Sequence, residues 1–121
     1  MDAKTMISDV KETVREFYSK RDWGQFHNAK DLAIGIVTEA SELLDLFRFK
    51  SVDEVNAMFG DDEKRDTIEQ EIADVFYFLL SLSERYDVDL TTALEKKLKI
   101  NSKKYPVEKV KGRNEKYTEY D

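Results

Sequence analysis

The sequence contains no cysteine, one proline and one histidine among its 121 residues. Without cysteine the chain has no disulfide, no thiolate zinc site and no cysteine nucleophile. The single histidine, His27, excludes a metal site built from several imidazoles. No apolar run approaches the roughly 18 residues of a membrane-spanning helix. Because the N-terminus is charged from Asp2 onward, no signal peptide is expected. These absences predict a soluble, cytoplasmic protein.

Basic residues are also outnumbered. The 26 acids exceed the 20 lysines and arginines, which gives a formal net charge of −6. An acidic protein is a poor partner for a nucleic-acid polymer, because binding to the phosphate backbone relies on a basic surface. A small phosphorylated ligand held together with a metal ion remains compatible with this charge. The length predicts one domain over residues 1–121.

The spacing of apolar residues predicts an all-α fold, a helical bundle of four main helices plus a short connecting helix. The four main helices are expected at about 2–20, 31–49, 62–86 and 89–105, with the short one between 51 and 60. Ser51 and Glu54 have the form of a capping box, and Asp2 and Asp89 are candidate caps. Pro106 ends the last main helix. Residues 21–30 and 107–121 are expected to be loop.

Two acid pairs, Glu39/Glu42 and Glu71/Asp74, lie on the second and third main helices. Acids three residues apart occur about as often as chance predicts in a chain with 26 of them, so the spacing alone carries no signal. With about 100° of rotation per residue, however, each pair falls on the same edge of its helix's apolar stripe. Packing through these stripes would bring four carboxylates together as an oxygen-rich Mg²⁺ site. The alternative is that these acids lie at a solvent-exposed edge of the helices and bind no metal.

The fourth main helix carries a polar residue on its apolar stripe. Leu90, Leu94, Leu98 and Tyr105 mark a face expected to be buried, and Asn101 lies in the middle of it. Lys97 and Lys104 lie at its edge. One interpretation is a ligand contact by Asn101 with two phosphate contacts by the lysines. The other is an asparagine bonded to a neighbouring helix and lysines that extend to solvent.

Several motifs in order make the chain resemble a known family, the all-α nucleoside triphosphate pyrophosphohydrolases of the MazG-like superfamily, and most closely its dCTP pyrophosphatase branch. The resemblance covers about residues 10–118. It rests on Arg21-Asp-Trp23-x-x-Phe26-His27, Glu39-x-x-Glu42-Leu, Glu71-x-x-Asp74-Val, Lys97-x-x-x-Asn101-x-x-Lys104-Tyr105-Pro106 and Lys116-Tyr117-Thr118.

The resemblance implies hydrolysis of a (deoxy)nucleoside triphosphate, such as dCTP or a related deoxynucleotide, to monophosphate and pyrophosphate. The reaction would serve to remove unwanted nucleotides from the nucleotide pool. It implies Mg²⁺ as cofactor and assembly of the chain into a homodimer or homotetramer. Glu39, Glu42, Glu71 and Asp74 would bind the metal. Glu42 and Glu71 are the expected catalytic residues, with Glu42 the first candidate for the general base. Lys97, Asn101 and Lys104 would contact the nucleotide.

Aromatic residues around the implied nucleotide pocket differ in part from the family pattern. Trp23 would help to form the pocket, although it is equally suited to anchor its loop. Phe49 stands where the dCTP branch is expected to have tryptophan, and Phe78 where it is expected to have tyrosine. His27 is better interpreted as a loop histidine bonded to the backbone than as a catalytic residue. From a different functional class, the same fold could serve as a non-catalytic helical dimerisation or adaptor module.

Overall fold

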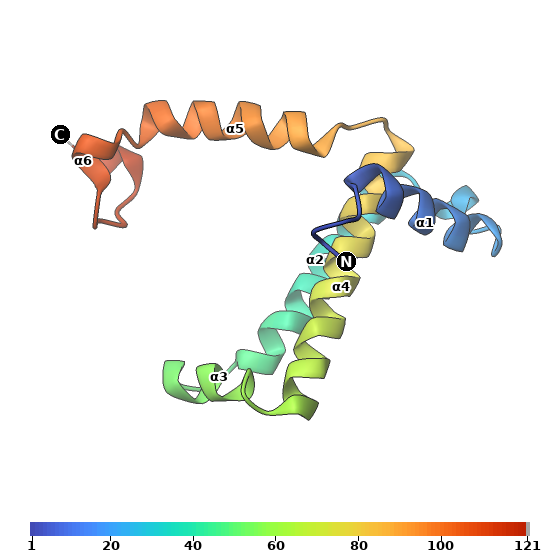
Figure 1. Ribbon diagram of the computed structural model, residues 1–121, viewed down its shortest axis with the longest axis horizontal. Coiled ribbons are helices and arrows are strands. Elements are labelled where there is room, and N and C mark those ends of the chain that lie inside the picture. Colours follow the sequence, from blue (N-terminus) through green and yellow to red (C-terminus); the bar gives the residue numbers. More distant parts are fainter. Residues whose placement is uncertain (121) are drawn as a thin grey trace. The chain divides into compact units, whose positions relative to one another are not determined.

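The computed structural model describes residues 1–120, and within them the chain is helical, with no strand. The all-α class is therefore confirmed. The elements are α1 (Ile7–Ser19), η1 (Gly24–Phe26), α2 (Ala29–Phe47), α3 (Val52–Met58), α4 (Asp62–Arg85), α5 (Leu90–Lys104), α6 (Val107–Val110) and η2 (Tyr117–Glu119) (Figure 1). They form two compact units, one from Met1 to Val88 and one from Asp89 onward.

Local hydrogen bonds set most helix starts. The side chains of Asn28, Ser51, Asp61 and Asp89 each accept a hydrogen bond from the backbone N–H three residues later. The capping box at Ser51 and the cap at Asp89 confirm the sequence predictions. The prediction that Asp2 starts the first helix is wrong. The amides of Lys4 and Thr5 bond to the carbonyl of Met1 in a separate turn, and α1 begins only at Ile7.

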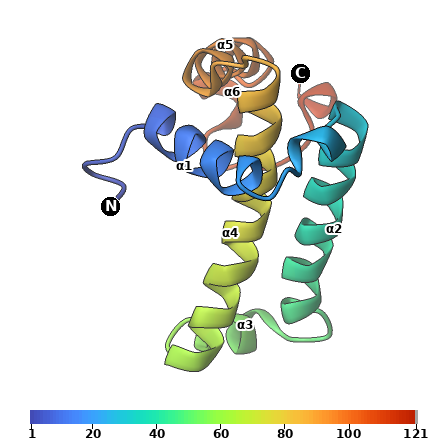
Figure 2. The same cartoon turned by 90° about the vertical axis from the view of Figure 1, so that its right-hand side faces the viewer.

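The first unit is built on two neighbouring antiparallel helices. Figure 2 shows α2 and α4 side by side in opposite directions, with α3 at the end where the chain passes between them. α1 packs on α4 near the C-terminal end of that helix. The buried apolar side chains of this unit are Tyr18, Leu32, Met58, Ile68 and Leu80.

Gly35 lets the two long helices come close together. A methyl group placed on Gly35 would lie 2.5 Å from Cδ1 of Phe78 on α4, far inside van der Waals contact. The ring of Phe78 therefore occupies the space that any other residue at position 35 would fill. Glycine is unfavourable within a helix, and here its cost is offset by this packing.

The predicted apolar stripes are only partly buried. Val37 and Leu44 on α2 are 66% and 64% exposed, and Ile72 and Phe76 on α4 are also exposed. The helices meet instead on the side of each stripe that carries the glutamates and Gly35. A large part of both apolar faces is left uncovered by the chain itself.

The second unit is organised around Tyr105, just after α5. The rings of Tyr117 and Tyr120 each pack edge-on against it at a centroid distance of 6.1 Å, and its hydroxyl accepts a hydrogen bond from the amide of Tyr117. The tail contains α6 and η2, so the prediction of an all-loop tail is wrong. The predicted buried stripe is only partly found, because Leu90 and Tyr105 are half-buried whereas Leu94 and Leu98 are exposed. Within this unit the rings of Tyr117 and Tyr120 pack at Tyr105, and Leu94 and Leu98 stay uncovered.

None of the described helices combines the length and the apolar composition needed to cross a bilayer.

Candidate metal centre

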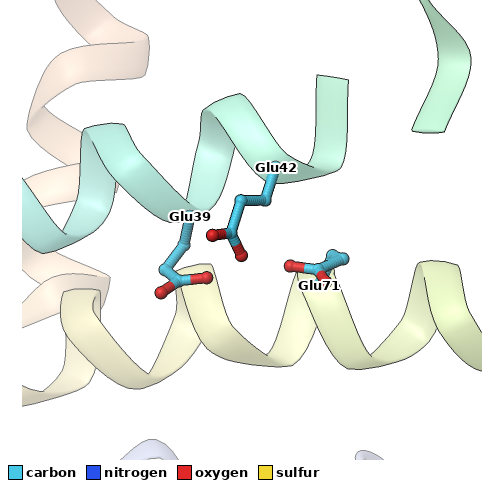
Figure 3. A group of neighbouring side chains, drawn as sticks. All are labelled: Glu39, Glu42 and Glu71. Atoms are coloured by element: carbon cyan, nitrogen blue, oxygen red, sulfur yellow. The ribbon is translucent and has the colours of Figure 1, made fainter. Parts of the chain in front are cut away.

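Three glutamates come together between the two long helices. Glu39 and Glu42 lie about one turn apart on α2, and Glu71 faces them from α4 (Figure 3). One carboxylate oxygen from each lies within 4.8 Å of the other two. Gly35 lies one turn before Glu39, so the close approach at Phe78 brings the helices together next to this glutamate cluster. Helix packing thereby places acids that are about 30 residues apart in sequence at one point.

The cluster has a surplus of negative charge. Partial burial, followed by the proximity of Glu42, raises the pKa of Glu39. Burial, followed by the charges of Glu42 and Asp74, also raises the pKa of Glu71. Oε2 of Glu71 is buried and has no hydrogen-bond partner among the described residues. Within that part of the chain, none of the three glutamates forms an ion pair with a cationic side chain.

This donor set fits a hard divalent cation. Carboxylate oxygens are the ligands that Mg²⁺ prefers, and the ion usually keeps several waters and binds substrate phosphates. A cation would compensate the repulsion between carboxylates that, after burial, raises the two pKa values. It would also give the unpartnered oxygen of Glu71 a ligand role. The structure therefore favours a metal site over the alternative of solvent-exposed acids that bind no metal.

Asp74 was predicted as the fourth member of the cluster, and it lies outside the group of three. It is exposed on α4, about one turn after Glu71. Its charge still raises the pKa values of Glu39 and Glu71, so it lies near enough to act on the site. A direct role for Asp74 as a metal ligand stays a prediction.

The three aromatic residues predicted to contact substrate lie in the first unit in different environments. Trp23 is half exposed in the loop after α1, and its ring packs edge-on against Phe17. Phe49 is 92% exposed just after α2, at a positive φ of 65°, with the Arg48 guanidinium over its ring. Phe78 is half-buried on α4 against Gly35. Trp23 and Phe49 therefore present ring surface to solvent.

The polar residues predicted to contact substrate belong to the second unit. Lys97 is exposed on α5, and Asn101 on the same helix is half-buried. The ammonium of Lys104 lies 4.9 Å from the ring centroid of Tyr117. Their role in nucleotide binding stays a prediction from the family resemblance.

One set of contacts was not predicted from the sequence. Glu84, Arg85 and Tyr86 at the end of α4 each hold a group in or beside the loop that carries Trp23. The paired groups are 57 to 66 residues apart in the chain. No local pattern could have indicated contacts at such separations.

The chain is similar to known proteins along most of its length. A profile of the MazG-like family matches residues 34–120. The dCTP pyrophosphatase 1 proteins of Homo sapiens and Mus musculus are each 34% identical over 113 residues, which cover 93% of this chain and 66% of those proteins. This chain thus spans slightly less than two thirds of the length of these relatives.

A solved structure also resembles this one. The crystal structure of a pyrophosphatase from Archaeoglobus fulgidus superposes with a TM-score of 0.76 at 33% sequence identity. The match covers 82% of this chain and 91% of that one. The family profile, the identity to these relatives and the shared helical fold together place this protein in the MazG-like family.

Proposed function

We propose that the protein is a Mg²⁺-dependent nucleoside triphosphate pyrophosphohydrolase acting on dCTP or a related deoxynucleotide in the cytoplasm. The observation that carries this proposal is the group of three uncompensated glutamates between α2 and α4, within 4.8 Å of one another. The names of the relatives, dCTP pyrophosphatase 1 and pyrophosphatase, support the substrate class and the bond cleaved.

In the proposed reaction, the three glutamates of the cluster would hold the metal, with Asp74 as a nearby fourth acid. A Mg²⁺ ion held there would supply neutralisation of phosphate charge and a lowered pKa of the attacking water. Water adds to a phosphorus of the α–β phosphoanhydride, and the bond to the bridging oxygen breaks. The products are a monophosphate and pyrophosphate. A carboxylate of the cluster accepts the proton of the water, and Glu42 and Glu71 are the two candidates.

The nucleotide would be held by aromatic and basic side chains. The exposed rings of Trp23 and Phe49 are suited to stacking on a base, which contributes about 1–3 kcal/mol and tolerates different bases. Phe78 would form a wall of the pocket close to the cluster. We propose that Lys97, Asn101 and Lys104 contact the phosphates and sugar, as the family resemblance implies.

A pyrophosphate-release assay over all common NTPs and dNTPs tests this function. We expect release from dCTP with Mg²⁺ and none after chelation with EDTA, because the uncompensated glutamates need the cation to bind a triphosphate. Orthophosphate as the first product would mean that a different bond is cleaved. Absence of pyrophosphate with every nucleotide would favour the non-catalytic adaptor function instead.

We also propose that the chain assembles with itself, as a homodimer or homotetramer. The support is the uncovered apolar surface on α4, where Ile72, Phe76 and Leu79 are each at least 40% exposed next to Leu43 of α2. Apolar patches of this kind are typical of association surfaces. Sedimentation equilibrium is expected to give a mass at least twice that of the 14.2 kDa chain. A fully active monomer would contradict the proposal.

A further inference from the structure

The loop between α1 and α2 carries Trp23, the single tryptophan of the protein. In this Trp23 loop, residues 21–28, the amides of Phe26, His27 and Asn28 donate to carbonyls of the loop, and those of Arg21 and Asp22 donate to carbonyls at the end of α1. The amide of Trp23 donates to the carbonyl of Tyr18 at 3.0 Å, and Gln25 bonds within the loop to Asp22. These bonds shape the loop itself and its junction with α1, and contacts from outside decide how the loop is seated on the rest of the unit.

Those outside contacts come from three consecutive residues at the end of α4. The hydroxyl of Tyr18 donates to the carboxylate of Glu84. Nε of Arg85 donates to the backbone carbonyl of His27 at 3.3 Å. The hydroxyl of Tyr86 accepts a hydrogen bond from the amide of Ala29 at 2.8 Å. The α4 terminus thus holds the loop near its start, at its end and at the first residue of α2.

Tyr18 is the buried support of this arrangement. It is only 6% exposed, its ring centroid lies 4.6 Å from that of His27, and a methyl group placed on Gly24 would lie 3.7 Å from its Cε1. Burial and then the bond to Glu84 raise the pKa of Tyr18 to about 12, so the hydroxyl is a donor at neutral pH. Burial and then Arg85 lower the pKa of His27, which favours packing of its uncharged ring against Tyr18.

A row of aromatic rings connects the loop with the neighbourhood of the glutamate cluster. The ring of Trp23 packs on Phe17 at 5.8 Å, Phe17 on Tyr77 at 5.9 Å, and Tyr77 on Phe78 at 5.2 Å. Phe78 in turn fills the space beside Gly35, one turn from Glu39. A shift of the loop would therefore move the Trp23 ring relative to Phe17, the next ring in this row.

We infer that Glu84, Arg85 and Tyr86 form an anchor that fixes the Trp23 loop and thereby positions Trp23 for the base of the nucleotide. The inference rests on the proposed function and adds positioning residues to it, at the opposite end of α4 from its start at Asp62. None of the three is assigned a contact with substrate or with the metal.

Fluorescence of Trp23 tests the anchor without any catalysis, because no other tryptophan contributes to the signal. Tyr18→Phe and Tyr86→Phe each remove one hydroxyl and keep the ring. Both are expected to raise the acrylamide quenching constant of Trp23, with the helical circular dichroism unchanged. Glu84→Gln keeps an acceptor for Tyr18 and should preserve the wild-type quenching, whereas Glu84→Leu should not. Tyr120→Phe is the matched control, since Tyr120 bonds to Glu115 in the second unit.

Kinetics then test the positioning role. In Tyr18→Phe and Tyr86→Phe we expect KM for dCTP to rise about 3- to 10-fold, the effect of one lost hydrogen bond, with little change in kcat. Unchanged quenching in both variants would overturn the anchor. Raised quenching with unchanged KM would overturn the role in nucleotide binding. Absence of turnover in the wild type would contradict the proposed function, whereas the quenching comparison would still decide whether the anchor exists.

Discussion

Replacing Glu71 with glutamine is expected to lower pyrophosphate release from dCTP at saturating Mg²⁺ by at least about 100-fold, equivalent to about 3 kcal/mol. The change keeps the shape of the side chain and removes one negative charge from the cluster. Glu71 contributes the only carboxylate of the group from α4, and its Oε2 has no protein partner among the described residues. The measurement is kcat over a Mg²⁺ titration, which separates weaker metal binding from lost catalysis.

The same variant is expected to be at least as stable as the wild type without metal. The folded-state pKa values of Glu39 and Glu71 are raised. The folded protein therefore binds protons at these groups more tightly than the unfolded chain does. Above these raised pKa values, ionisation of the two carboxyl groups lowers the stability of the folded state. This destabilisation disappears as the pH falls below the ordinary pKa of a glutamate. Urea unfolding at pH 7 and at pH 4 should show the gain of Glu71→Gln at the higher pH only.

Asp45 provides the matched control for this prediction. It follows Glu42 on α2 at the same spacing of three, but it is exposed and lies 3.7 Å from Arg48 in an ion pair outside the cluster. Asp45→Asn removes the same charge and should leave turnover within about 2-fold, since exposed pairs contribute little. Near-normal turnover of Glu71→Gln would remove Glu71 from the site. An equal loss in both variants would indicate a general charge effect.

Replacing Gly35 with alanine is expected to lower the free energy of unfolding by about 1–3 kcal/mol, the usual cost of overpacking. Within a helix, alanine is otherwise favoured over glycine by about 1 kcal/mol, so a neutral site would be stabilised. Here the new methyl would lie 2.5 Å from Phe78, and either the ring or the helix must move. Because α2 and α4 carry the glutamates, separation of the helices should also weaken Mg²⁺ binding. Urea denaturation and a metal titration measure the two effects.

A second substitution and a control keep this prediction specific. Phe78→Leu removes the ring that opposes Gly35, so the double variant should recover much of the lost stability, a coupling visible in a double-mutant cycle. Gly60→Ala is the control, because the nearest atom to its new methyl would be 3.5 Å away, an ordinary contact. A Gly35→Ala variant that is more stable than the wild type would contradict the prediction. It would show that the Phe78 ring moves aside without loss of stability.

The sequence by itself determined the all-α class, most starts of the main helices and the three glutamates that the structure brings together. Caps such as Ser51 and Asp89, and the stop at Pro106, act through hydrogen bonds and backbone restrictions within a few residues, which a linear pattern contains. The placement of Glu39 and Glu42 on one side of α2 follows from helical geometry alone. The ordered motifs also led to the family that the comparisons support.

The tertiary structure decided which sides of the helices meet. Periodicity identifies residues that favour burial, but a helix with a broad apolar stripe can rotate about its axis and still bury part of it. Gly35 and Phe78 select one rotation, which joins Glu39 and Glu42 to Glu71 and leaves Val37 exposed. The contacts of Glu84, Arg85 and Tyr86 span 57 to 66 residues. Such contacts depend on how α1, α2 and α4 pack together, and no local pattern in the chain encodes them.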